Sequence, residues 1–212
     1  MNLLYFDIET VPAAPEHHGL LREEYESRKA KGRKVEDTFE EYLDRTGLGG
    51  EFGRVVCLAY ALNEQPVEVI WGEEREILEG FWRVAGAIDR RADRFIGHNI
   101  YDFDFPFLVK RSRILGVPPG SGGLPNFARY RQTPIYDTMR EWDLWSNRQV
   151  SMDFLAKALG LPTSKDLMDG SEVASYYAAG RIEEICEYCK KDVELTRQIY
   201  KKLTWQFDAS PR

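Results

Sequence analysis

The chain has 212 residues, and its acidic side chains outnumber the basic ones to give a formal net charge of −6 at pH 7. A chain of this length can form one large hydrophobic core but not two, so we expect a single domain over residues 1–212. No apolar run is long enough to cross a bilayer, and Asp7 interrupts the apolar start, so we expect neither a membrane span nor a secretory signal but a cytoplasmic location. The negative charge argues against a protein that holds nucleic acid by an overall positive field. It does not exclude a nuclease.

Apolar, β-favouring runs open the chain and return after a charged segment. The first strand is expected at Asn2–Ile8, and Glu9–Pro12 end it. Residues 13–50 are highly charged with few apolar positions, which predicts an insert of exposed helices or a mobile flap. Two β-rich runs follow, Arg54–Leu62 and Val67–Trp71, and the turn-like residues between them predict an antiparallel pair.

Helical spacing dominates the rest of the chain. Apolar residues recur at this spacing over Glu74–Arg90. The later elements are expected as strand, helix, strand and three helices, at Arg94–Gly97, Asp104–Leu115, Ile135–Asp137, Met152–Leu159, Ser171–Ala178 and Arg181 to about Trp205. This order predicts an α/β fold of three layers, in which helices flank a mixed central sheet.

The three cysteines do not indicate a disulfide framework, because their number is odd and small. Cys186 and Cys189 form a CxxC pattern. No second such pair and no downstream His pair accompany it, so we do not expect a zinc or redox site.

Asp7 and Glu9 are two residues apart at the end of the first strand. Side chains at this spacing point to the same face of a strand, so the two acids are expected to converge. The residues before them are apolar, and a partly buried carboxylate needs a compensating cation. Two surface acids at a strand end are the alternative.

Two more acidic segments follow later in the chain. Asp102 and Asp104 lie where a strand joins a helix, where an acid also serves as an ordinary helix cap. Tyr188 and Asp192 are four residues apart in the last helix, so they share one face.

Carboxylates such as these hold Mg²⁺ or Mn²⁺, and two such ions suit phosphoryl displacement. The sequence contains no phosphate-binding glycine loop, GxSxG or HExxH pattern.

Three segments resemble, in order and spacing, the exonuclease motifs of the DEDD superfamily of 3′→5′ exonucleases: FDIET at 6–10, GHNIYDFDFPFL at 97–108 and YCKKD at 188–192. The resemblance is closest to the stand-alone PolB-like predicted exonucleases and to the exonuclease domain of family B DNA polymerases. Residues 152–173 also resemble the stand-alone group. The resemblance implies a ribonuclease H-like fold and a catalytic set of Asp7, Glu9, Asp104, Tyr188 and Asp192.

Within this set the resemblance assigns individual roles. The four acids Asp7, Glu9, Asp104 and Asp192 are the implied metal ligands. The motif aligns Asp104 rather than Asp102 with the ligand. Tyr188 implies the tyrosine (DEDDy) subclass, because the histidine subclass has its base where Glu187 stands here. The implied mechanism uses two divalent cations, Mg²⁺ or Mn²⁺, to activate the attacking water and to stabilise the leaving 3′ oxygen. A tyrosine is a poor base at neutral pH, so Tyr188 is expected to orient that water.

The expected substrate is nucleic acid with a free 3′ end, with single-stranded DNA as the first choice. Residues expected to touch it are Thr10, Val11, His98, Asn99 and Lys165. A solvated loop lysine is the alternative for Lys165. An exoribonuclease and a catalytically silent nucleic-acid-binding scaffold are the alternative functions. A replication or repair protein is a candidate partner, because no polymerase domain is attached.

Overall fold

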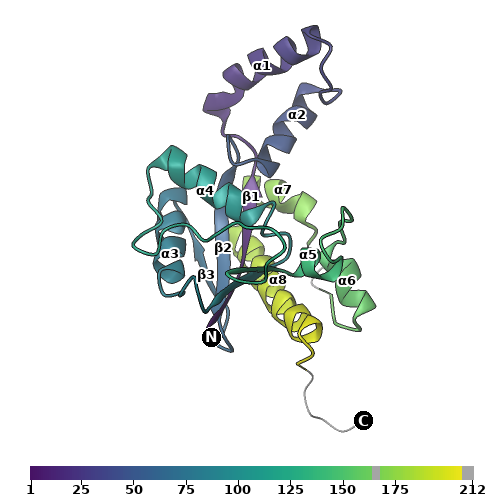
Figure 1. Ribbon diagram of the computed structural model, residues 1–212. Coiled ribbons are helices and arrows are strands. Elements are labelled where there is room, and N and C mark those ends of the chain that lie inside the picture. The colour runs from purple at the N-terminus through teal and green to yellow at the C-terminus, as the bar shows by residue number, and fades with distance from the viewer. Residues whose placement is uncertain (164–167, 207–212) are drawn as a thin grey trace.

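The computed structural model describes residues 1–163 and 168–206 and contains a five-stranded mixed sheet flanked by helices (Figure 1). The strands lie in the order β3-β2-β1-β4-β5. Their bounds are β1 Leu3–Val11, β2 Arg54–Leu62, β3 Glu68–Trp71, β4 Arg94–Gly97 and β5 Ile135–Asp137. β2 pairs antiparallel with β3, as predicted, and also with β1, while β4 runs parallel to β1 and to β5. The carboxyl ends of the three parallel strands therefore meet at one edge.

Helices cover both faces of the sheet, which gives the predicted three layers. α3 (Glu74–Ala85) and α4 (Asp104–Leu115) pack on one face. α7 (Val173–Ala178) and the long α8 (Ile182–Leu203) pack on the other. The remaining helices are shorter or lie outside these layers: α1 His18–Ala30, α2 Phe39–Arg45, α5 Thr138–Trp142, α6 Met152–Ala158, and the 3-10 turns η1 Pro15–His17, η2 Thr46–Leu48 and η3 Gly170–Glu172. In the described part of the chain, no helix has the length and apolar character needed to cross a membrane.

The alternation of side chains along β1 builds both layers of the core. Leu4, Phe6 and Ile8 belong to the cluster shared with α3 and α4, whereas Tyr5 and Val11 belong to the cluster shared with α8. Successive side chains of a strand point to opposite faces, so β1 is buried on both sides. Its central place in the sheet fixes where the acids at its end lie.

Two predicted boundaries differ from the structure by three or more residues. β1 continues to Val11, with an irregularity in its pairing with β2 between Glu9 and Thr10. The helix predicted to reach Arg90 ends at Ala85, although Ile88 is still buried. The short α5 was missed. It has only five residues, and its start is fixed by the Asp137 side chain, which accepts hydrogen bonds from two of its amides.

The charged insert forms a helical hairpin of α1 and α2, which stands above the end of β1 (Figure 1). Its helices bury a small core of their own around Leu21, Tyr25 and Phe39. A capping box between Thr38 and Glu41 starts α2. Of the two predicted states of the insert, the structure has the helical one.

Candidate active site

Asp7 and Glu9 come from the carboxyl half of β1, on the face covered by α8. One ligand atom of each lies within 4.8 Å of the other and of Cys189 Sγ. The convergence predicted from their spacing is therefore observed. Glu9 is buried and Asp7 is partly buried, and burial makes unpaired negative charge unfavourable for both carboxylates.

Asp104 reaches the same place from another layer. It is the first residue of α4, has only 2% of its surface exposed, and its Oδ1 accepts a hydrogen bond from the Ile8 amide at 3.2 Å. Asp102 points elsewhere: its Oδ2 accepts from Arg140 Nε at 2.8 Å, and Arg129 lies 3.7 Å from its Oδ1. The structure thus brings Asp104, and not Asp102, to β1.

α8 supplies the last two side chains of the predicted set. Tyr188 and Asp192 are one turn apart on the buried face of this helix, which packs against β1 and β2. A Cβ atom placed on Gly170 would lie 3.9 Å from the Tyr188 hydroxyl, so this hydroxyl lies beside the η3 turn. Tyr188 is therefore at the boundary between the acids and the segment before α7.

The four acids act electrostatically as one cluster. Burial raises the pKa of Asp7 well above its usual value, and the charges of Asp104, Glu9 and Asp192 raise it further. Burial also raises the pKa of Glu9, and the charges of Asp192 and Asp104 raise it further. For Asp104, burial raises the pKa to about 8. Carboxylates from three separate elements thus repel one another in a buried place, an arrangement that bound cations would stabilise.

The donor set fits hard divalent cations. Carboxylate oxygens are the ligands that Mg²⁺ and Mn²⁺ prefer, and four acids from one cluster can hold two such ions. Asp7, Glu9, Asp104 and Asp192 are the residues that would hold them.

Tyr188 keeps its proton in this setting. Burial raises the pKa of its hydroxyl far above the usual value, and the negative charges of Asp192, Glu9 and Asp7 add to the effect. A phenol in this state donates a hydrogen bond and does not accept a proton at neutral pH.

Cys189 is a neighbour of the acids that sequence reasoning did not place. Its Sγ lies 3.5 Å from both the backbone oxygen and Oδ2 of Asp7, so its thiol donates toward that residue. Cys57 lies opposite Glu9 in the pairing of β1 with β2. The signal was present in the helix, because Cys189 and Asp192 are three residues apart and share a face. The CxxC pattern pairs Cys189 with Cys186, whereas the relevant neighbour of Cys189 on the helix is Asp192.

Asp137 is a second residue that the sequence analysis missed. Its carboxylate accepts hydrogen bonds from the amides of Asn99 at 2.9 Å, Tyr101 at 3.0 Å and Met139 at 3.0 Å. These bonds tie the loop between β4 and α4 to the end of β5. Asp137 therefore positions the loop that delivers Asp104.

Three of the predicted substrate contacts have other partners. The Thr10 hydroxyl donates to the Gly47 carbonyl at 2.7 Å. Val11 is only 3% exposed and belongs to the core. The two ring nitrogens of His98 lie 2.9 Å from Thr138 Oγ1 and from the Val150 carbonyl. The Val11 and His98 side chains are thus packed or hydrogen-bonded within the protein, and their contact with substrate stays a prediction.

The other two predicted contacts differ in status. Asn99 has a left-handed backbone (φ 65°), and its buried Oδ1 accepts no hydrogen bond from residues 1–163 or 168–206. Lys165 lies outside the described residues.

A groove of about 780 Å³ reaches one of these acids, Glu9. Glu9, Thr10 and Phe103 line it together with the segment before and within α7 and with residues of the insert. The groove gives a polymer access to the Glu9 carboxylate, which a closed cavity would not.

A mixed sheet in this strand order, with helices on both faces, is a ribonuclease H-like fold. The model of a family described as a predicted 3′-5′ exonuclease related to the exonuclease domain of PolB matches residues 52–207. The chain belongs to this family. The matched region begins after the insert, so the insert and β1 with Asp7 and Glu9 lie outside it.

Individual relatives agree with this assignment. The DNA polymerase of Archaeoglobus fulgidus is 24% identical over 160 residues, which are 70% of this chain and 20% of the polymerase. An uncharacterized protein of Methanocaldococcus jannaschii is 24% identical over 170 residues, which are 76% of this chain and 92% of that protein.

A solved structure shows the same fold. The family B DNA polymerase of the hyperthermophilic archaeon Pyrobaculum calidifontis superimposes with a TM-score of 0.67 at 22% sequence identity. The match covers 96% of this chain and 24% of the polymerase. The predicted ribonuclease H-like fold and the predicted family resemblance are confirmed, while the chain spans about a quarter or less of either polymerase.

Proposed function

We propose that the protein is a metal-dependent 3′→5′ exonuclease that hydrolyses phosphodiester bonds from the 3′ end of single-stranded DNA. The observation that carries this proposal is the meeting of four acids from β1, α4 and α8 in one buried cluster beside an open groove. Membership of a family of predicted exonucleases supports the direction of cleavage. We expect a replication or repair protein as the partner.

The residues of the site have different roles in this proposed reaction. The four acids hold two divalent cations, Mg²⁺ or Mn²⁺, which when bound supply activation of the attacking water and charge stabilisation at the leaving 3′ oxygen. Tyr188 retains its proton and donates a hydrogen bond that orients the water. Asp137 positions the loop before Asp104, and Cys189 donates toward Asp7. The burial of Glu9, Asp104 and Asp192 strengthens the charge interactions of these acids.

The activity is tested with 5′-labelled single-stranded DNA and RNA of equal sequence, each with Mg²⁺, Mn²⁺ or chelator. A ladder that shortens from the 3′ end of the DNA and disappears with chelator is the expected result. Faster shortening of the RNA would assign an exoribonuclease instead. Internal cuts, or equal cleavage in chelator, would overturn the proposal, and no cleavage of either strand would point to a silent scaffold.

Replacing Tyr188 with Phe is expected to slow cleavage about 10–100-fold while leaving metal binding intact. The change removes one hydrogen-bond donor and no carboxylate, and positioning groups of this kind contribute on that scale. Single-turnover rates and calorimetric titration with Mn²⁺ measure the two effects separately. Tyr177→Phe is the matched control, because this partly exposed tyrosine lies on α7. Loss of Mn²⁺ binding in Tyr188→Phe would contradict the assigned role.

A further inference from the structure

The inner end of the charged insert forms part of the wall of the active-site groove. Asp44, Arg45, Gly47 and Leu48 line the groove that also contains Glu9. These residues lie at the end of α2 and in η2, about 40 positions after the acids of β1. The insert is thus adjacent to the site and not merely appended to the surface.

Three contacts fix this part of the insert to β1 and to the two residues that follow it. Thr10, the residue after Glu9, donates a hydrogen bond from its hydroxyl to the Gly47 carbonyl at 2.7 Å. The Ala13 amide donates to Thr46 Oγ1 at 2.8 Å. A Cβ atom on Gly47 would lie 3.2 Å from the backbone nitrogen of Pro12, so the two backbones are in close contact. The wall is therefore held in register with the carboxylates.

The side chains of this wall suit the two parts of a nucleotide. Leu48 is an apolar side chain with 63% of its surface exposed, although it lies in a groove beside a polar site. Arg45 lines the groove, and its exposed guanidinium is paired with Glu36 at 3.0 Å. Phe103 contributes an aromatic ring to the same groove. An apolar surface packs on a base, and a guanidinium binds a phosphate.

We propose that the α1–α2 hairpin is the strand guide of this exonuclease, in which Leu48 packs on a base near the 3′ end and Arg45 binds a backbone phosphate. This inference rests on the proposed function and names the residues that select a single strand. The occupant follows from the shared groove, since a strand that lies in it at Glu9 also lies beside Leu48. A base is free to pack on Leu48 only when it is not paired within a duplex.

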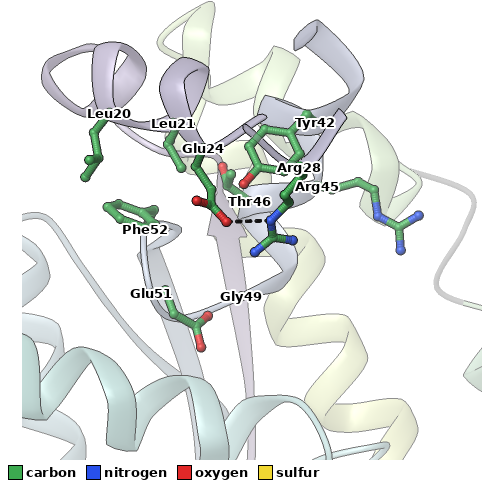
Figure 2. A pocket seen from close by; sticks show the side chains of 10 residues that line it. All are labelled: Leu20, Leu21, Glu24, Arg28, Tyr42, Arg45, Thr46, Gly49, Glu51 and Phe52. Carbon is green, nitrogen blue, oxygen red and sulfur yellow. Dashed lines mark hydrogen bonds and ion pairs between the residues drawn. The ribbon is translucent and has the colours of Figure 1, made fainter. Parts of the chain in front are cut away.

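The hairpin offers a matched control on its outer side. Leu20 is also an exposed leucine of the insert (57%), but it lines a separate pocket of about 600 Å³. Figure 2 shows Leu20 and Phe52 at one end of this pocket, and the Arg45 side chain pointing away from the Glu24–Arg28 ion pair at the other. Leu20 is absent from the lining of the active-site groove.

The first test compares Leu48→Ala with Leu20→Ala. An oligonucleotide with 2-aminopurine next to its 3′ end is titrated with each protein in chelator, so that binding is measured without cleavage. Leu48→Ala is expected to raise Kd about tenfold and to weaken the fluorescence change, because packing on a base is lost. Leu20→Ala is expected to match the unmodified protein. Equal Kd values for the two variants would overturn the proposal.

The second test concerns the phosphate contact. Arg45→Ala is expected to lower the slope of log K against log salt by about one, as loss of one phosphate contact should. Arg33→Ala removes the same charge from an exposed position of the hairpin and is expected to leave the slope unchanged. Equal slopes in Arg45→Ala and the unmodified protein would contradict the phosphate contact. Thermal melting of each variant verifies that the hairpin is intact.

The two proposals fail in different ways. If the unmodified protein does not shorten DNA from its 3′ end, the proposed function is wrong. If it does so, and Leu48→Ala binds and shortens DNA as Leu20→Ala does, only the strand guide is wrong.

Discussion

Replacing Asp104 with Asn is expected to reduce kcat by more than about 100-fold. Removal of a group that merely supports a metal ligand costs about 10–100-fold, and Asp104 is proposed as a ligand itself. Asn keeps the shape of the side chain and can accept from the Ile8 amide as Asp104 does at 3.2 Å. The loss should therefore reflect charge and not folding. Initial rates on 5′-labelled single-stranded DNA at saturating Mg²⁺ measure it.

Asp102→Asn is the matched control, because it makes the same change two residues away. Asp102 is paired with Arg140 and Arg129 outside the acidic cluster, so this variant should retain close to full activity. The reverse pattern, with full activity in Asp104→Asn and loss in Asp102→Asn, would show that the wrong acid was chosen. Asp7→Ala and Asp192→Ala are expected to lose activity as Asp104→Asn does.

Metal-free protein is expected to lose stability as the pH rises from about 4 to about 8. Burial raises the pKa of Asp104 from 3.8 to about 8 in the folded state. A carboxyl with a raised pKa binds its proton more tightly in the folded state than in the unfolded state. Its contribution to the free energy of unfolding is therefore fully present below the unfolded pKa and is lost as the pH rises through the folded pKa. The raised pKa values of Asp7 and Glu9 act in the same direction. The free energy of unfolding should fall on the order of a few kcal/mol across this range.

Divalent cations are expected to reverse this loss. Ions that bind the folded acids and not the unfolded chain stabilise the protein by mass action. Urea unfolding at pH 5 and pH 8, with chelator and with Mn²⁺, measures both effects. Asp104→Asn should show a shallower pH dependence, while Asp102→Asn should follow the unmodified protein. An unfolding free energy that is the same at both pH values, and unchanged by Mn²⁺, would show that the acids do not form the coupled cluster.

Patterns that are local in the chain predicted much of the fold. The strands Arg54–Leu62, Arg94–Gly97 and Ile135–Asp137 and the helix Asp104–Leu115 have the bounds that their periodicity indicated. Alternation in a strand and apolar spacing in a helix indicate which side of the element is buried, and both patterns can be read from a single sequence. Boundaries set by single contacts were less predictable, as the five-residue α5 shows.

The contacts around the site were harder to predict. Thr10 was expected to touch substrate, yet its hydroxyl is bonded to Gly47 of the insert. His98 was expected to offer a donor, yet both its nitrogens have partners in the protein. These partners are 37, 40 and 52 residues away, and nothing in the local sequence indicates which distant segment packs against a given side chain.

The sequence by itself determined the acids, their order and the likeness to known exonuclease motifs, because residue type and short spacing are properties of a local segment. Tertiary structure alone decided that Asp104 meets the amide of Ile8, that Cys189 lies against Asp7, and that the insert lines the groove. Those facts depend on how β1, α4, α8 and the hairpin pack together. Packing is set by the shape and burial of whole elements, and a motif does not contain that information.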